Sequence, residues 1–177
     1  MVKIFRYKKV ISTNTLAKQL LLKEKGNFIV VAKQQSGGRG QRGKNWYSPP
    51  CGLYFSLVLQ PVQSPLKFSD FPCQVTKVLK KVIEKLFNVS VQIKKPNDLL
   101  IQGKKIAGIL VESATRCKKI RHLIVGIGVN LEIDFSATVL AEVAASLADF
   151  SRQKRSGFRF LQEFFKQFQA DFPALFI

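Results

Sequence analysis

The chain has 177 residues, enough for one domain with its own core, and 46% of them are hydrophobic. No apolar run approaches the roughly 20 residues that span a membrane, and the N-terminus MVKIFRYKKV lacks the apolar segment of a signal peptide. With 29 basic and 11 acidic residues the net charge is +18, which favours anionic partners such as nucleotides, nucleic acids or acidic proteins. We therefore expect a cytoplasmic protein with no membrane partner, organised as a single domain over residues 1–177.

The cysteines give no sign of a metal centre. Cys51, Cys73 and Cys117 are odd in number, and their spacing fits no metal-binding pattern such as C-x-x-C. We predict reduced thiols in a reducing compartment and no protein-bound metal.

The first third of the chain predicts a helix followed by two strands. Ser12 or Thr13 can cap a helix whose apolar residues recur at helical spacing until Gly26 ends it. The apolar, β-branched run at residues 28–32 predicts a strand, and residues 53–61 predict another, closed by a proline.

Three later segments predict helices. The strongest signal is the apolar stripe over residues 75–86, for which Ser69 is a suitable cap. Residues 138–150 and 158–172 each show amphipathic spacing and predict two further helices.

The remaining regular segments predict strands. Residues 89–95 alternate, residues 99–113 predict a hairpin that turns at Gln102 and Gly103, and residues 122–132 supply one more strand. About six strands and four helices in this order predict an α+β fold, a mixed β-sheet covered by helices.

The connection GGRGQRGKNWYSPP at residues 37–50 comes within one residue of a P-loop, reading G-x-x-x-x-G-K-N from Gly38 to Asn45. A P-loop requires a helix directly after it, and Pro49 and Pro50 exclude one. We therefore predict a cationic, glycine-rich connection between two strands, whose backbone N–H groups and basic side chains suit a phosphate. From composition alone, a flexible basic loop without a ligand is an equal alternative.

Short motifs on either side of this loop resemble those of the biotin protein ligases. The loop is similar to the family pattern G-R-G-R-x-G-R-x-W-x-S-P, KKPND to K-W-P-N-D, and KKIAGILVE to K-x-x-G-I-L-x-E. STNTLAK before the loop and VGIGVNL near residue 130 complete a resemblance that runs from about residue 10 to about residue 150. It implies the biotin/lipoate ligase-like fold of the class II aminoacyl-tRNA synthetase and biotin synthetase superfamily.

The resemblance also implies an activity. Such enzymes use ATP and Mg²⁺ to convert biotin to biotinyl-5′-AMP, then pass biotin to a lysine of a biotin carboxyl carrier domain. Two anions must be brought together, so the site needs positive charge but no protein nucleophile. The sole histidine, His122, is accordingly predicted to belong to a strand surface.

The resemblance assigns a role to each matched residue. The predicted catalytic residues are Lys105 and Arg39. The predicted biotin-binding residues are Ser12, Thr13, Asn14, Gln35, Gly108, Gly126 and Gly128. The predicted adenylate- and phosphate-binding residues are Gly38, Arg39, Gly40, Gln41, Arg42, Asn97, Asp98 and Asn130. Magnesium is expected to arrive with ATP and to lie near Asp98.

Some of these residues also have an ordinary structural role available to them. Ser12 and Thr13 are good helix caps, the Asn97–Asp98 pair after a proline is typical of a turn, and glycines in a strand often mark a bulge.

The chain departs from the family pattern at three positions: Gln41 and Lys44 replace arginines, and Lys95 replaces the tryptophan of K-W-P-N-D. It shows no N-terminal helix-turn-helix, so we expect no specific DNA binding. It ends about where a small C-terminal β domain begins in many members. The resemblance does not decide whether the protein is a monomer or a homodimer.

Two alternatives are carried beside the biotin ligase reading. One is a lipoate or octanoyl ligase of the same superfamily, although the histidine expected near its glycine-rich motif is missing. The other is a basic nucleic-acid-binding module, suggested by the net charge, with aromatic stacking partners at Trp46, Tyr47 and Tyr54.

Overall fold

In the computed structural model, residues 2–60, 69–116, 119–154 and 156–176 are described, and their strands form one mixed sheet. Along the sheet the order is β1-β2-β3-β7-β6-β5-β4. The strands are β1 (Lys3–Tyr7), β2 (Phe28–Ala32), β3 (Gly52–Leu59), β4 (Gln92–Lys94), β5 (Asp98–Ile101), β6 (Lys104–Arg116) and β7 (Lys119–Asn130). Only β1 and β2 pair in parallel within this described part; the other pairs are antiparallel. This confirms the predicted α+β arrangement.

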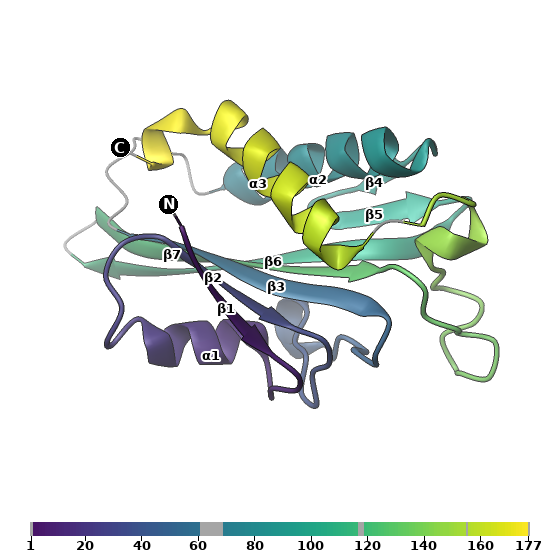
Figure 1. The fold of residues 1–177 in the computed structure, drawn as a ribbon, viewed down its shortest axis with the longest axis horizontal. Coiled ribbons are helices and arrows are strands. Elements are labelled where there is room, and N and C mark those ends of the chain that lie inside the picture. Colours follow the sequence, from purple (N-terminus) through teal and green to yellow (C-terminus); the bar gives the residue numbers. More distant parts are fainter. Residues whose placement is uncertain (1, 61–68, 117–118, 155, 177) are drawn as a thin grey trace.

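Helices cover both faces of the sheet. They are α1 (Thr13–Leu20), α2 (Phe71–Phe87) and α3 (Gly157–Asp171), with short 3-10 turns at Gln41–Gly43, Leu147–Asp149 and Pro173–Leu175. Figure 1 shows α2 and α3 on one face and α1 alone on the other. No helix in the described ranges is long and apolar enough to cross a membrane.

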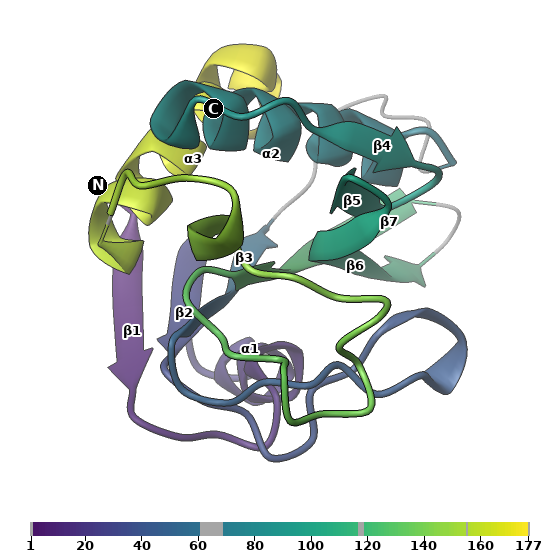
Figure 2. The ribbon, with the colours of Figure 1, turned by 90° about the vertical axis from the view of Figure 1, so that its right-hand side faces the viewer.

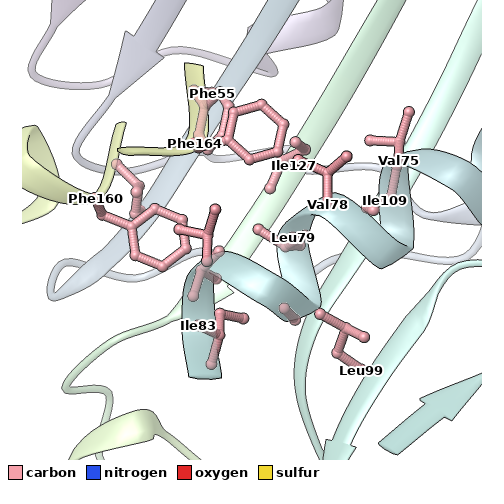
Figure 3. Packing of buried hydrophobic residues seen from close by; sticks show 14 of the residues in the cluster. Phe55, Val75, Val78, Leu79, Ile83, Leu99, Ile109, Ile127, Phe160 and Phe164 are labelled. Carbon is pink, nitrogen blue, oxygen red and sulfur yellow. The ribbon is translucent and has the colours of Figure 1, made fainter. Parts of the chain in front are cut away.

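The main core lies between the sheet and the α2/α3 layer. Phe55 and Ile127 of the sheet, Leu79 of α2, and Phe160 and Phe164 of α3 are at most 3% exposed, and Figure 3 shows them interdigitating. Each such side chain contributes about 1.5–3 kcal/mol by its burial. This layer fixes the sheet from one side.

A smaller apolar cluster lies under α1, where Ala17 packs against Phe28, Val30, Val58 and Ile124. Leu16 and Leu20 of α1 pack against the same cluster, which therefore anchors the helix after its first turn. The first turn of α1 rests instead on polar residues of the same sheet face, so a polar site there does not interrupt the main core.

Two sequence predictions were confirmed closely. The apolar stripe forms α2, although the helix begins at Phe71 with Asp70, not Ser69, at its N-cap. The hairpin between β5 and β6 turns at Gln102 and Gly103, with φ of 49° and 80°. Such paired positive φ values match the twist of the flanking strands.

The predicted helix at 138–150 was wrong. This segment makes turns and one 3-10 turn because its backbone bonds to distant residues: Ala145 donates to the carbonyl of Lys105, and Lys105 donates to that of Val143. Two smaller errors are the strand β1, which was missed, and α1, which ends at Leu20 rather than near Gly26.

Candidate active site

A cavity of about 350 Å³ opens on the sheet face that carries α1. Figure 2 shows the β2–β3 connection and the first part of the segment after β7 on this same side of the sheet, away from α2 and α3. The first turn of α1, the loop at 39–46, the turn at 95–98 and the strands β6 and β7 line the cavity. All the predicted site residues except Gly38 and Asn130 line it.

One end of the cavity, the polar end, is formed by Ser12, Thr13, Asn14 and Gln35. The side-chain oxygen Oε1 of Gln35 accepts from the Thr13 backbone N–H at 2.8 Å and from the Thr13 hydroxyl at 3.2 Å. Ser12 is the N-cap residue of α1, but its hydroxyl makes no capping bond. Ser12 therefore does not act as a side-chain cap, and the residue lines the cavity.

Asn14 is held from two strands. Its Oδ1 accepts a hydrogen bond from Ser56 of β3 at 2.6 Å, and its Nδ2 donates to Glu112 of β6 at 2.7 Å. A Cβ at Gly126 of β7 would overlap Oδ1 of Asn14. The missing side chain at Gly126 thus makes room for Asn14 itself.

Trp46 covers the middle of the cavity wall. A Cβ at Gly128 would overlap its indole nitrogen, and one at Gly108 would lie 2.8 Å from its ring. The indole N–H is buried without a hydrogen-bond partner among the described residues. Sequence reasoning matched Trp46 to a motif but gave it no place in the site.

The other end of the cavity, the cationic end, carries Arg39, Arg42, Lys44, Lys95 and Lys105. Lys105 Nζ lies 2.7 Å from Asp98 Oδ1 and 4.9 Å from the Trp46 ring centroid. Asp98 is the one acidic residue among the described residues that line the cavity. The excess of cations favours a ligand with several negative charges.

The loop that supplies these cations folds back on itself. Arg39 and Asn45 pair through their backbones as an isolated antiparallel β-bridge, and the Gly40 N–H donates to the Lys44 carbonyl at 2.7 Å. Arg42 has a φ of 55°, a left-handed conformation rarely taken by such a residue. No α-helix follows the loop, as predicted, and β3 begins at Gly52.

Two of the predicted residues, Asn97 and Asn130, bond to backbone carbonyls, and a third, Gly38, leaves room for its neighbours. Asn97 donates to the Ile109 carbonyl at 2.6 Å, which ties the turn at 95–98 to β6. Asn130 donates to the carbonyls of Lys105 and Ala145 and so holds the start of β6. Gly38 is buried, and a Cβ there would lie 2.6 Å from Ser48 Oγ.

A second cavity of about 480 Å³ adjoins the first across Trp46, Asp98 and Lys105. Its walls include apolar and aromatic side chains, and Asn130 lies in it. The apolar and aromatic residues are Tyr47, Leu100, Phe135, Leu140, Val143 and Ala144.

The residues of the cavity suit a magnesium ion that is bound mainly by a substrate rather than by the protein. The described residues contain no group of three or more histidine, cysteine, aspartate or glutamate side chains that could hold a metal. Mg²⁺ at nucleotide sites is commonly bound by one or two carboxylates together with phosphate oxygens. Asp98 can supply one such carboxylate.

The aromatic residues do not form an exposed stacking platform. Tyr54 is 0% exposed, and its hydroxyl donates to the Pro49 carbonyl at 2.8 Å. Burial raises the pKa of Tyr54 well above its usual value, so the hydroxyl stays a donor. Trp46 faces the two glycines. The nucleic-acid alternative thereby loses Tyr54, which is buried, as a stacking partner.

Comparison with known proteins agrees with this geometry. The chain is 35% identical over 137 residues to the bifunctional ligase/repressor BirA of Bacillus spizizenii, covering 71% of this chain and 40% of that protein. It is 35% identical over 122 residues to a biotin–[acetyl-CoA-carboxylase] ligase of Paracoccus denitrificans, covering 68% and 51%. The chain thus spans less than two thirds of either relative.

A solved structure is similar over almost the whole chain. The biotin protein ligase of Aquifex aeolicus in complex with biotin and ATP matches with a TM-score of 0.85 and 25% identity, covering 99% of this chain and 72% of that one. The model of the biotin/lipoate A/B protein ligase family matches residues 7–130, more than half of the chain. The fold, the ordered motifs and this match agree, and the chain belongs to the biotin/lipoate A/B protein ligase family.

Proposed function

We propose that this protein activates biotin with ATP to biotinyl-5′-AMP and then transfers biotin to a lysine of a biotin carboxyl carrier domain. The observation that carries the proposal is one cavity with a neutral, hydrogen-bonding end and a cationic end, joined along β7. Asn14 lies at Gly126, Trp46 at Gly128, and Lys105 is bonded through its carbonyl to Asn130. The relative from Aquifex aeolicus, solved with biotin and ATP, supports it.

The polar end suits the ureido head of biotin, which is neutral and both donates and accepts hydrogen bonds. Thr13 and Asn14 are each 4% exposed, so their polar groups lie away from bulk water. A ligand that failed to pair with them would leave buried donors and acceptors unsatisfied, which costs about 1–3 kcal/mol per group. This gives the site a physical basis for selecting a ureido ring over an apolar one.

The cationic end suits the reacting groups. In the first step a carboxylate oxygen of biotin attacks the α-phosphorus of ATP, and the bond to pyrophosphate breaks. Two anions must approach, and Lys105 would lie between the carboxylate and the α-phosphate and stabilise the charge that develops there. The Lys105 ammonium pairs with Asp98, and the substrate anions would take over part of that pairing.

The second cavity suits the adenine ring. Its apolar walls, with Phe135 and Val143, favour a flat aromatic base, and Trp46 and Lys105 border both cavities. An adenylate would therefore cross from one cavity to the other at Lys105. Magnesium would arrive with the ATP phosphates and contact Asp98.

The second step needs no protein nucleophile. The amine of the carrier lysine attacks the acyl carbon of the adenylate, AMP leaves, and an amide bond results. The net charge of +18 favours encounter with an acidic carrier domain. The free thiols of Cys51 and Cys73 support a reducing compartment such as the cytoplasm; Cys117 lies outside the described residues.

The proposal is tested by incubating the purified protein with biotin, magnesium-ATP and a purified biotin carrier domain, and measuring the carrier's mass. We expect one biotin per carrier, lost when the acceptor lysine is changed to arginine. No labelling of carrier domains from several carboxylases would refute the transfer step.

A further inference from the structure

We infer that Glu112 is a positioning residue: it fixes which way the side-chain amide of Asn14, which Ser56 also contacts, presents its oxygen and nitrogen to the ligand. The inference rests on the proposed function and extends it to residues outside the predicted site. Neither Glu112 nor Ser56 lines the cavity.

Three strands and one helix bring these groups together. Ser56 of β3 and Leu110 of β6 both pair with Gly126 of β7, and Glu112 lies two residues further along β6. Because side chains alternate along a strand, Ser56, Gly126 and Glu112 face the same side, under the first turn of α1. Asn14 is thus packed on Gly126 and bonded to the strands on either side of it.

The carboxylate of Glu112 joins the sheet to two successive turns of α1. Its Oε2 accepts from Asn14 Nδ2 at 2.7 Å, and its Oε1 lies 2.6 Å from Nζ of Lys18. Asn14 and Lys18 are four residues apart, so they lie on one face of the helix. The exposed ion pair with Lys18 contributes little by itself, but it holds the second carboxylate oxygen in place.

Glu112, rather than Ser56, decides the orientation of the amide. A primary amide has nearly the same shape when its oxygen and nitrogen are exchanged. The Ser56 hydroxyl can donate or accept and therefore tolerates either orientation. An ionised carboxylate only accepts, so the Asn14 nitrogen must face Glu112 and its oxygen must face Ser56.

This orientation determines what Asn14 offers to a ligand. One N–H of Asn14 is taken by Glu112, and one lone pair of its oxygen is taken by Ser56. Asn14 lines the cavity, so one donor and one acceptor remain in a fixed arrangement for the ureido group. Without Glu112 the amide can rotate, and the entropy lost when biotin binding orders it reduces the affinity for biotin.

The test compares biotin and ATP as ligands of the same variants. We expect Glu112→Ala to raise the Kd for biotin about tenfold and to leave the KM for ATP within about twofold of wild type. Glu112→Gln keeps the length of the side chain, but its amide can donate as well as accept, so it no longer imposes one orientation on Asn14 and should weaken biotin binding by a smaller factor than Glu112→Ala. Glu163→Ala is the matched control, since Glu163 and Glu112 have 27% and 29% exposed side chains and each pairs with a lysine at 2.6 Å.

A double-mutant cycle separates positioning from general stability. In an Asn14→Ala background, Glu112→Ala and Glu112→Gln should change biotin affinity no further, because the group they orient is absent. An equal loss in both backgrounds, an equal loss for biotin and ATP, or unchanged biotin affinity in Glu112→Ala would overturn the inference. If Glu112→Ala does not fold, biotin affinity is compared for Glu112→Gln in the wild-type and Asn14→Ala backgrounds, and an equal loss in both would again overturn the inference. Failure of the wild-type protein to bind biotin would instead refute the proposed function.

Discussion

The two ends of the cavity differ in burial and in how far their side chains are already held. At the polar end Ser12, Thr13 and Asn14 are 3–4% exposed, and Thr13 and Asn14 are hydrogen-bonded to neighbouring side chains. At the cationic end Arg39 and Arg42 are exposed on a connecting loop, and Lys105 is paired with Asp98.

The difference indicates two kinds of recognition. Under the proposed function, the preorganised polar end would select a neutral group by geometry, so its affinity should be insensitive to salt. The cationic end would attract phosphate by charge, and exposed charges are screened within about 8–10 Å at physiological salt. Variants that affect one end and spare the other therefore test the comparison.

The largest effect is expected for Lys105→Ala. Removing the cation at the reacting centre should slow adenylate formation by about 10²–10³-fold, while biotin affinity falls much less. Pyrophosphate release measures the rate. Lys104→Ala is the control, because the Lys104 side chain bonds to the Ala141 carbonyl instead, and an equal loss in both variants would argue against Lys105 as the catalytic cation.

Gly126→Ala should damage the polar end selectively. The new Cβ overlaps Asn14 Oδ1, so Asn14 must shift away from Ser56 and Glu112. Overpacking of this kind costs about 1–3 kcal/mol, which corresponds to about 5- to 160-fold weaker biotin binding by calorimetry. ATP binding should be retained; normal biotin affinity would show that the Asn14 position does not matter.

Arg39→Ala should weaken the cationic end alone. Loss of an exposed, charge-assisted contact to phosphate should raise the KM for ATP about five- to tenfold at low salt. The gap between variant and wild type should narrow as NaCl is added, because salt screens the contact that the variant lacks. A salt-independent gap, or a matching loss of biotin affinity, would contradict the division between the two ends.

The smallest effect concerns His122, outside both ends. Burial, followed by the charges of Arg121 and Lys18, lowers its pKa below the usual value. The folded protein therefore binds the proton less readily than the unfolded chain, so this contribution to stability is complete above the ordinary histidine pKa and is lost as the pH falls toward the lowered one. His122→Gln should reduce the fall in Tm between pH 7.5 and pH 5.5; an unchanged fall would show that His122 does not contribute.

Local patterns predicted the parts of the fold that local chemistry decides. The apolar stripe of α2, the turn at Gln102–Gly103 and the absence of a helix after Pro49 and Pro50 depend on neighbours in the sequence. The segment 138–150 has helical spacing, but its backbone pairs with Lys105. β1 has only five residues, and it is a strand because it pairs with β2, which its own sequence does not reveal.

Site residues could be predicted where they belong to a motif with a known role. They could not be predicted where their role depends on contacts that only the folded chain makes. Lys105 and Asn14 were found by resemblance. Trp46 stood in a motif, but its position over Gly108 and Gly128 follows only from the fold. Glu112 also stood in a motif, and Ser56 stood in none; their contacts with Asn14 depend on the register of three strands.

The central claim is that this cavity joins a biotin carboxylate to AMP at Lys105. The most direct measurement is mass-spectrometric detection of the acyl-adenylate, with pyrophosphate, after mixing the protein with magnesium-ATP and either biotin or lipoate. The account predicts biotinyl-5′-AMP from biotin, little product from lipoate, and product formation slowed by about 10²–10³-fold in the Lys105→Ala variant. Preferential formation of the lipoyl adenylate, or no adenylate with either acid, would contradict it.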